Sequence, residues 1–95
     1  MIIPKKIKIF GLDIPIEIKP LDDISGEYCI EGKSITIDKS LSPETKKQTF
    51  LHECFHAALR RTGASESLTE NQEETIVECL SIFVTDAFDI KVKKK

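Results

Sequence analysis

The spacing of apolar residues along the chain changes once, near residue 40. Up to that point, short segments alternate apolar with polar residues: "KKIKIF" (5–10), "IPIEIK" (14–19), "EYCI" (27–30) and "SITID" (34–38). Such alternation is typical of strands that bury one face. Further on, apolar residues recur every three or four positions, as in amphipathic helices. The sequence therefore predicts an α+β fold, with a small antiparallel or mixed sheet (1–39) packed on two long helices.

The strand segments are joined by short turns, which predict two hairpins. "GLD" separates the first pair of segments and "EGK" separates the second pair. Pro15 lies inside the second segment. Because proline has no backbone N–H to donate to a sheet, this strand is expected at an edge or is expected to begin after Pro15.

Each predicted helix has a start signal. Ser42 and Pro43 suit a cap and a first helical position, and Gly63 suits a left-handed stop, so the first helix is predicted over 43–62. The second helix is predicted over 67–88, because "SLTE" and "TENQ" both match a capping box. Two stripes at helical spacing are expected to face the core: Leu51, Phe55, Ala58 and Leu59 on the first helix, and Ile76, Val77, Leu80 and Val84 around Glu73 on the second.

Length and composition limit the classes of protein that the chain can belong to. Ninety-five residues without a repeat or linker predict one domain, 1–95. The net charge of −2 gives no indication of nucleic acid or an anionic membrane as partner, and no apolar run is long enough to span a bilayer. No signal peptide is recognisable, and three cysteines without a C-x-x-C pair indicate reduced thiols. We therefore expect a cytoplasmic protein (in the host cytoplasm if phage-encoded), as a monomer or a homodimer.

The segment "FLHECFHAALR" (50–60) contains both histidines of the chain, in the pattern H-E-x-x-H. His52 and His56 are four residues apart, so on a helix their imidazoles lie one above the other and can bind the same Zn2+ ion. Glu53 projects about 100° round the helix from His52, which places its carboxylate beside the zinc-bound water instead of on the metal. There it can act as the general base of a metal-assisted hydrolysis.

A third zinc ligand must be a carboxylate or a thiolate, because no third histidine exists. The helix "ENQEETIVECLSIFVTDAF" offers three glutamates. Glu73 lies at the centre of the predicted core stripe, where a lone carboxylate is costly unless paired or metal-bound, so we favour Glu73 over Glu74, the fallback, and Glu78. Cys54 and Cys79 are expected to be small buried residues. Tyr28 is a candidate donor to the developing oxyanion, although packing in a strand is its commoner role.

The order of these segments resembles that of the gluzincin metallopeptidases: a strand "SITID", then "FLHECFHAALR", then a downstream glutamate helix containing "EETIVECL". The similarity is greatest to their smallest members, the minigluzincins and short phage or bacterial proteins of the ImmA/IrrE type. The resemblance implies that His52, His56 and a helix glutamate hold the metal and that Glu53 is the general base. It also implies that "SITID" forms the rim of the cleft, where an extended peptide pairs with its edge.

Two functions from different classes remain open at this point. The first is a zinc metallopeptidase that hydrolyses peptide bonds of a peptide or protein substrate through zinc-bound water, with latent activity or narrow specificity. The second is a non-catalytic, zinc-stapled regulatory module that binds a partner protein. An open fourth position on the metal favours the peptidase, whereas a fourth protein ligand favours the module.

Overall fold

The structure is a computed structural model that describes residues 2–29, 31 and 33–93. Part of the predicted "EGK" turn and the end of the basic C-terminal run lie outside the described residues. The elements, in chain order, are β1 (Lys6–Ile9), β2 (Leu12–Lys19), β3 (Gly26–Cys29), β4 (Ser34–Asp38), α1 (Pro43–Arg61), the 3-10 helix η1 (Ala64–Ser67) and α2 (Glu70–Ala87). This arrangement confirms the predicted α+β class.

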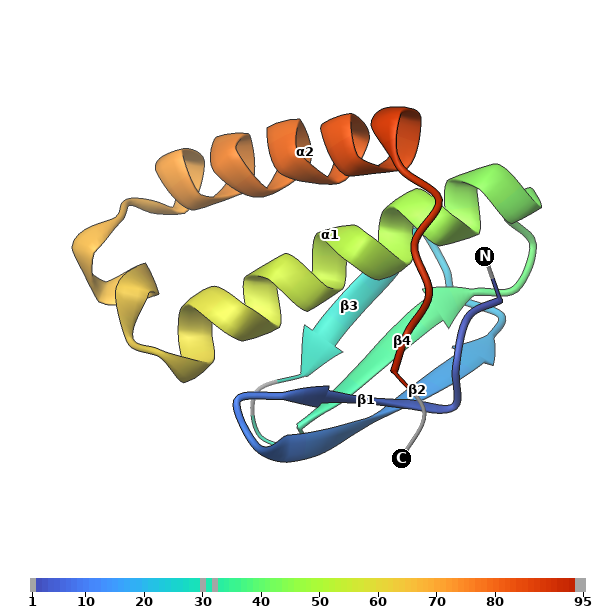
Figure 1. The fold of residues 1–95 in the computed structure, drawn as a ribbon, viewed down its shortest axis with the longest axis horizontal. Helices are drawn as coiled ribbons and strands as arrows, with labels where there is room; N and C mark the ends of the chain where they lie inside the picture. The colour runs from blue at the N-terminus through green and yellow to red at the C-terminus, as the bar shows by residue number, and fades with distance from the viewer. Residues whose placement is uncertain (1, 30, 32, 94–95) are drawn as a thin grey trace.

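The four strands form one mixed sheet in the order β1-β2-β4-β3 (Figure 1). β1 pairs with β2, and β3 pairs with β4, in antiparallel fashion, so both predicted hairpins are present. The hairpins are joined by the parallel pairing of β2 with β4, in which Ile16 lies opposite Ile35. The alternating pattern predicts strands but carries no information on this central parallel pairing, which depends on long-range packing.

Two expectations about strand position are corrected. β2 is an internal strand, not an edge, although it contains Pro15. Pro15 pairs with Lys6 of β1, whereas the pairing of β2 with β4 begins only at Ile16, so the missing N–H of Pro15 precedes the segment paired with β4. The strand "SITID" is β4, which is also internal, and the edge is taken by β3.

Capping side chains and a left-handed glycine mark the ends of the helices. The side chain of Ser42 accepts from the backbone N–H of Thr45 at the start of α1. Gly63, with φ of +79°, follows the end of this helix in the left-handed region that favours glycine. Thr69 and Gln72 form a reciprocal capping box, so α2 begins at Glu70 and not at Ser67, which belongs to η1.

The molecule has three layers, with α1 in the middle (Figure 1). One side of α1 packs on the sheet, where Ile14, Ile35, Ile37 and Phe50 form the centre of the core, and α2 packs on its other side. Because α1 is covered by two layers, buried residues lie on more than one of its faces, including Leu51, Glu53, His56 and Ala57. The active-site motif predicted from the sequence therefore lies in the best-shielded helix of the fold.

Candidate metal centre

His52, Glu53 and His56 all project from the middle of α1. His56 and Glu53 are each 8% exposed, and the side chain of His52 is 15% exposed. The two imidazole Nε2 atoms lie 3.2 Å apart, as expected for side chains at positions i and i+4 on one helix. The two rings therefore present adjacent nitrogen atoms toward α2.

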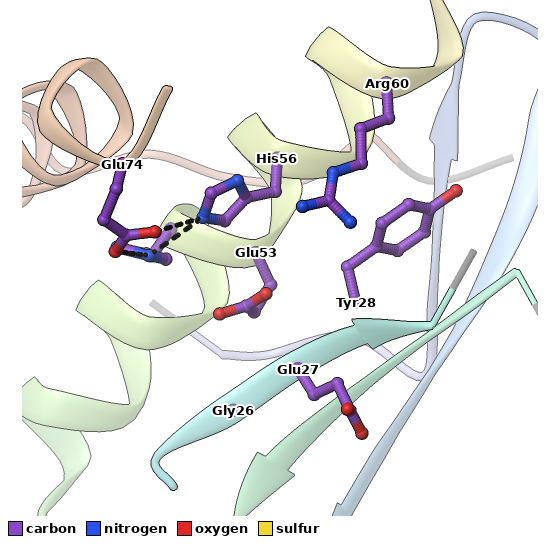
Figure 2. A pocket seen from close by; sticks show the side chains of 8 residues that line it. Gly26, Glu27, Tyr28, Glu53, His56, Arg60 and Glu74 are labelled. Carbon is purple, nitrogen blue, oxygen red and sulfur yellow. Dashed lines mark hydrogen bonds and ion pairs between the residues drawn. The ribbon is translucent and has the colours of Figure 1, made fainter. Parts of the chain in front are cut away.

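Glu74 of α2 completes a group of three candidate ligands with the two histidines. Its Oε1 lies 2.9 Å from Nε2 of His52, and its Oε2 lies 3.0 Å from Nε2 of His56. Figure 2 shows this carboxylate of α2 facing the imidazole of His56 on α1. Glu74 was only the fallback ligand in the sequence analysis, and it is the helix carboxylate that the structure brings to both Nε2 atoms.

Glu73, the favoured ligand from the sequence, lies on the other side of His56. It is buried, as its helical phase predicted, with 6% of its surface exposed. Its Oε2 is 2.5 Å from Nδ1 of His56 and 3.3 Å from Nε of Arg60. A carboxylate acceptor at Nδ1 keeps the ring proton there, so the lone pair of His56 is left on Nε2, facing Glu74.

The surroundings of Glu73 favour its charged form. Burial alone would raise the pKa of this carboxyl, but the Ser65 hydroxyl, the His56 ring and the Arg60 guanidinium beside it together lower the pKa below its usual value. A charged Glu73 is the form that accepts the Nδ1 proton of His56.

Glu78, the third carboxylate considered from the sequence, lies behind His52. Its Oε2 is 3.6 Å from Nδ1 of His52, and its Oε1 accepts a hydrogen bond from Nε2 of Gln48 at 3.2 Å. α2 thus places one carboxylate between the two histidines and one behind each ring.

Glu53 faces the open side of the same group without belonging to it (Figure 2). Burial raises the pKa of its carboxyl, and this effect outweighs the charges of nearby imidazoles and a backbone hydrogen bond from Tyr28. A carboxylate with a raised pKa, held beside candidate metal ligands, is suited to accepting and returning a proton.

The group opens into a cleft between the helices and the edge strand β3. Its lining includes Gly26, Glu27 and Tyr28 of β3 together with Arg60 of α1. Figure 2 shows the Arg60 side chain reaching toward the Tyr28 ring, and the Tyr28 hydroxyl pointing away from His56 and Glu74. The phenol is therefore not aimed at the centre, so the oxyanion role considered for Tyr28 has no support in this geometry.

Gly26 was not recognised from the sequence, although a glycine at the start of a strand is a known sign of close approach. A Cβ atom at this position would lie 2.6 Å from Cγ2 of Thr49 and 3.4 Å from Cγ of Glu53. The absence of a side chain therefore lets β3 approach α1 closely enough to form one wall of the cleft. Arg60 was also missed, because an arginine one turn beyond H-E-x-x-H is unremarkable in sequence.

The cysteines do not join the candidate ligands among the described residues. Burial raises the pKa of the Cys54 thiol to about 12, so it remains protonated at neutral pH, and Cys79 is exposed on α2. Cys79 is therefore not buried, contrary to expectation.

In this small α+β domain, a histidine pair and a glutamate converge from two packed helices. A domain with these features belongs to the class of metallopeptidase-like domains of minimal size. Within that class, residues 5–91 match the family of IrrE N-terminal-like domains, peptidase family M78, and the chain belongs to this family. A search among curated proteins found no match. Within the described part of the chain, neither helix has the length and apolar character needed to cross a membrane.

Proposed function

We propose that this protein is a zinc-dependent peptidase in which His52, His56 and Glu74 hold the metal and Glu53 is the general base. The observation that carries the proposal is the convergence of two imidazole Nε2 atoms and one carboxylate at separations of 2.9, 3.0 and 3.2 Å. Membership of a peptidase family supports the reaction class.

The donor set fits zinc. Bonds of about 2.0–2.1 Å in a tetrahedral arrangement place neighbouring ligand atoms roughly 3.3 Å apart, close to the three separations here. Two imidazoles with one carboxylate are also a known ligand set of catalytic zinc. The carboxylate behind His56 supports this reading, because it holds the ring in the tautomer that a metal requires.

When bound, zinc would acidify a water molecule and polarise the peptide carbonyl. Glu53 accepts the proton of the attacking water as the new carbon–oxygen bond forms, and it returns that proton to the amine nitrogen as the peptide bond breaks. Its raised pKa assists the first of these steps, because a more basic carboxylate takes up a proton more readily. Arg60, on the cleft wall, places positive charge near the bound carbonyl oxygen.

The substrate in this proposal is an extended peptide that lies along β3. This strand is at the sheet edge, and three of its four residues line the cleft. A second hollow lined by Ser25, Thr45, Gln48 and Glu78 continues past His52 and Glu53, so the cleft extends along the edge on both sides of the centre. Backbone pairing of this kind binds a peptide with little dependence on sequence.

The competing function was a zinc-stapled module with no catalytic role. It requires a fourth protein ligand, and the group of candidate ligands found among the described residues contains only His52, His56 and Glu74. The position toward Glu53 and the cleft is thus left for a water or substrate, which favours the peptidase.

The test compares Glu53→Gln with wild type for zinc content and for cleavage of an unfolded protein substrate such as casein. Glutamine keeps the size of the side chain but cannot take up a proton, so zinc content should stay near one per chain. Cleavage should fall by roughly 10²–10⁴-fold. His52→Ala serves as the matched control that loses both zinc and activity. Cleavage by Glu53→Gln at the wild-type rate, or loss of zinc from that variant, would disprove the role given to Glu53.

A further inference from the structure

The two ends of the cleft carry side chains of opposite charge. A row of side chains four residues apart runs along α1 beside the cleft: Gln48, His52, His56 and Arg60. Side chains at this spacing form a continuous ridge on a helix, and twelve residues of helix span about 18 Å. The two histidines occupy the middle of the row. The residues at its ends therefore lie on opposite sides of the point at which a bound peptide would be cleaved.

At one end of the row, Arg60 is the only lysine or arginine among the described residues that line the cleft beside Tyr28. Its Nε–H donates to Oε2 of Glu73 at 3.3 Å, and this contact anchors the side chain. Figure 2 shows the terminal guanidinium nitrogens directed into the space between His56 and Tyr28. The side chain is 38% exposed, and an arginine presents its N–H groups in a planar fork that matches a carboxylate.

The acidic residues near this end leave most of the guanidinium open. Glu73 accepts from one of the five N–H groups of Arg60, and no other described residue accepts from them. The carboxylate of Glu74 faces the imidazoles. Figure 2 shows the carboxylate of Glu27, on the same wall, pointing away from His56. Four N–H groups of Arg60 are therefore left for a substrate.

The opposite end of the row is acidic. The hollow that continues past His52 is lined by Gln48 and Glu78, and its described lining residues include no lysine or arginine. Oε1 of Glu78 accepts from Nε2 of Gln48 at 3.2 Å, which holds the carboxylate at the wall, and the Glu78 side chain is 47% exposed. A carboxylate held in this way complements a lysine or arginine of a bound peptide.

We propose that the cleft selects an extended peptide with an acidic side chain at the Arg60 end and a basic side chain at the Glu78 end. This selection rests on the proposed peptidase function, since the same cleft binds the substrate. Each end of the row lies one helical turn, about 6 Å, beyond the nearest histidine, and an extended peptide advances about 3.3 Å per residue. The two charged residues of the substrate therefore lie within about two residues of the cleaved bond.

The test measures peptide binding to the full chain carrying Glu53→Gln, which keeps the cleft but removes the proposed general base. In one fluorescent peptide with blocked, uncharged ends, a glutamate precedes a lysine by four positions, and in the other peptide the order is reversed. Four positions span about 13 Å and place both side chains on one face of an extended peptide. The two peptides have the same composition and net charge, so only the order of the charges differs.

Fluorescence anisotropy should show at least 10-fold tighter binding of one order than of the other. The favoured order gives the direction of the peptide along β3. Equal binding of both orders would overturn the proposal. So would tighter binding of a peptide in which a free C-terminal carboxylate replaces the glutamate, since Arg60 would then recognise the end of a chain.

Substitutions at the two ends of the row test which residues cause the preference. Arg60→Gln and Glu78→Gln, each added to this chain, should reduce the ratio of the two affinities at least threefold. The ratio is the readout because Arg60 also takes part in the proposed reaction. A purely structural role would weaken the binding of both orders alike, and an unchanged ratio would therefore count against the proposal.

Arg61→Gln and Glu70→Gln are the matched controls. Arg61 donates to backbone oxygens at the turn between β1 and β2, and Glu70 is exposed at the start of α2. Both controls should leave the ratio unchanged, and thermal melts verify that all variants fold. A control that reduces the ratio as much as Arg60→Gln does would mean that the general charge of the protein, and not the cleft, causes the preference.

Cleavage of the same two peptides by the zinc-loaded wild-type chain separates failure of the charge selection from failure of the peptidase function. A preference in binding without cleavage of either peptide would support the charge selection and contradict the peptidase. Cleavage of both orders at equal rates would support the peptidase and overturn the charge selection.

Discussion

Oε2 of Glu73 lies 2.5 Å from Nδ1 of His56, on the opposite side of the imidazole from Glu74. Two consecutive residues of α2 therefore contact two different nitrogens of one ring. This is possible because successive side chains on a helix diverge by about 100°, so the carboxylates of Glu73 and Glu74 reach opposite sides of the His56 ring. One carboxylate orients the ring, and its neighbour completes the set of candidate ligands.

The first prediction separates these two roles. Glu74→Ala removes a proposed ligand and should lower zinc affinity more than any other substitution on α2. Glu73→Ala removes only the support of His56 and should lower affinity about 10–100-fold. Competition titration against a zinc-sensitive chelating dye measures both. If Glu73→Ala loses more affinity than Glu74→Ala, then Glu73 is the ligand and the present assignment is reversed.

Glu78 provides a milder case on the same helix. Its carboxylate is 3.6 Å from Nδ1 of His52, so the pair is looser than the one between Glu73 and His56. Glu78→Ala should therefore reduce zinc affinity less than Glu73→Ala does in the same titration. An equal or larger loss would indicate that His52 depends on its supporting carboxylate as strongly as His56 does.

The second prediction concerns metal and stability. The proposed ligands come from α1 and α2, so zinc should bind the folded protein and stabilise it. At a free zinc concentration near 100 times Kd, the gain is about 2.7 kcal/mol, or a rise in Tm on the order of 10 °C. Calorimetry with and without a chelator measures this difference. His52→Ala should melt at the same temperature under both conditions, and a wild type insensitive to chelator would remove zinc from the proposal.

The sequence predicted the parts of this structure that depend on local chemistry. Ser42, Gly63 and the Thr69 capping box mark helix ends through contacts within a few residues, and period-two segments mark the strands. The parallel pairing of β2 with β4 and the three-layer order could not be predicted in this way. They depend on which faces meet across the chain, which local patterns do not encode.

The ranking of the helix glutamates depended on the same kind of local information. Helical phase correctly placed Glu73 on the buried side of α2, and this position was the reason for favouring Glu73 as the third ligand. Helical phase does not show which carboxylate faces both imidazole Nε2 atoms, and in the structure this is Glu74, whose side chain is 56% exposed. The same phase placed Leu80 in the core, whereas α2 turns this residue outward.

The third prediction tests how β3 approaches α1. Gly26→Ala introduces a Cβ atom that would lie 2.6 Å from Cγ2 of Thr49 and 3.0 Å from the backbone oxygen of Thr36. Overpacking of this kind typically costs about 1–3 kcal/mol of unfolding free energy. Urea unfolding of the metal-free protein measures the loss. The double variant Gly26→Ala/Thr49→Ser removes the clashing methyl group and should recover part of the stability. No recovery would place the clash at the Thr36 backbone.

The last prediction concerns Glu53 in the metal-free protein. Burial raises its pKa from the ordinary value near 4.5, so the folded state binds the proton more tightly than the unfolded state does. Ionising Glu53 therefore destabilises the fold as pH rises from about 4.5 through the raised folded pKa. Below this window the carboxyl is protonated in both states and has no such effect.

Glu53→Gln cannot ionise, so its unfolding free energy relative to wild type should increase as pH rises through that window and then level off. Urea unfolding between pH 4 and pH 8, with chelator present throughout, measures the difference between the two proteins. Chelator is needed because bound metal would add its own dependence on pH. A difference that stays constant across this range would mean that the carboxyl of Glu53 has no raised pKa, and the electrostatic basis for its part in proton transfer would be lost.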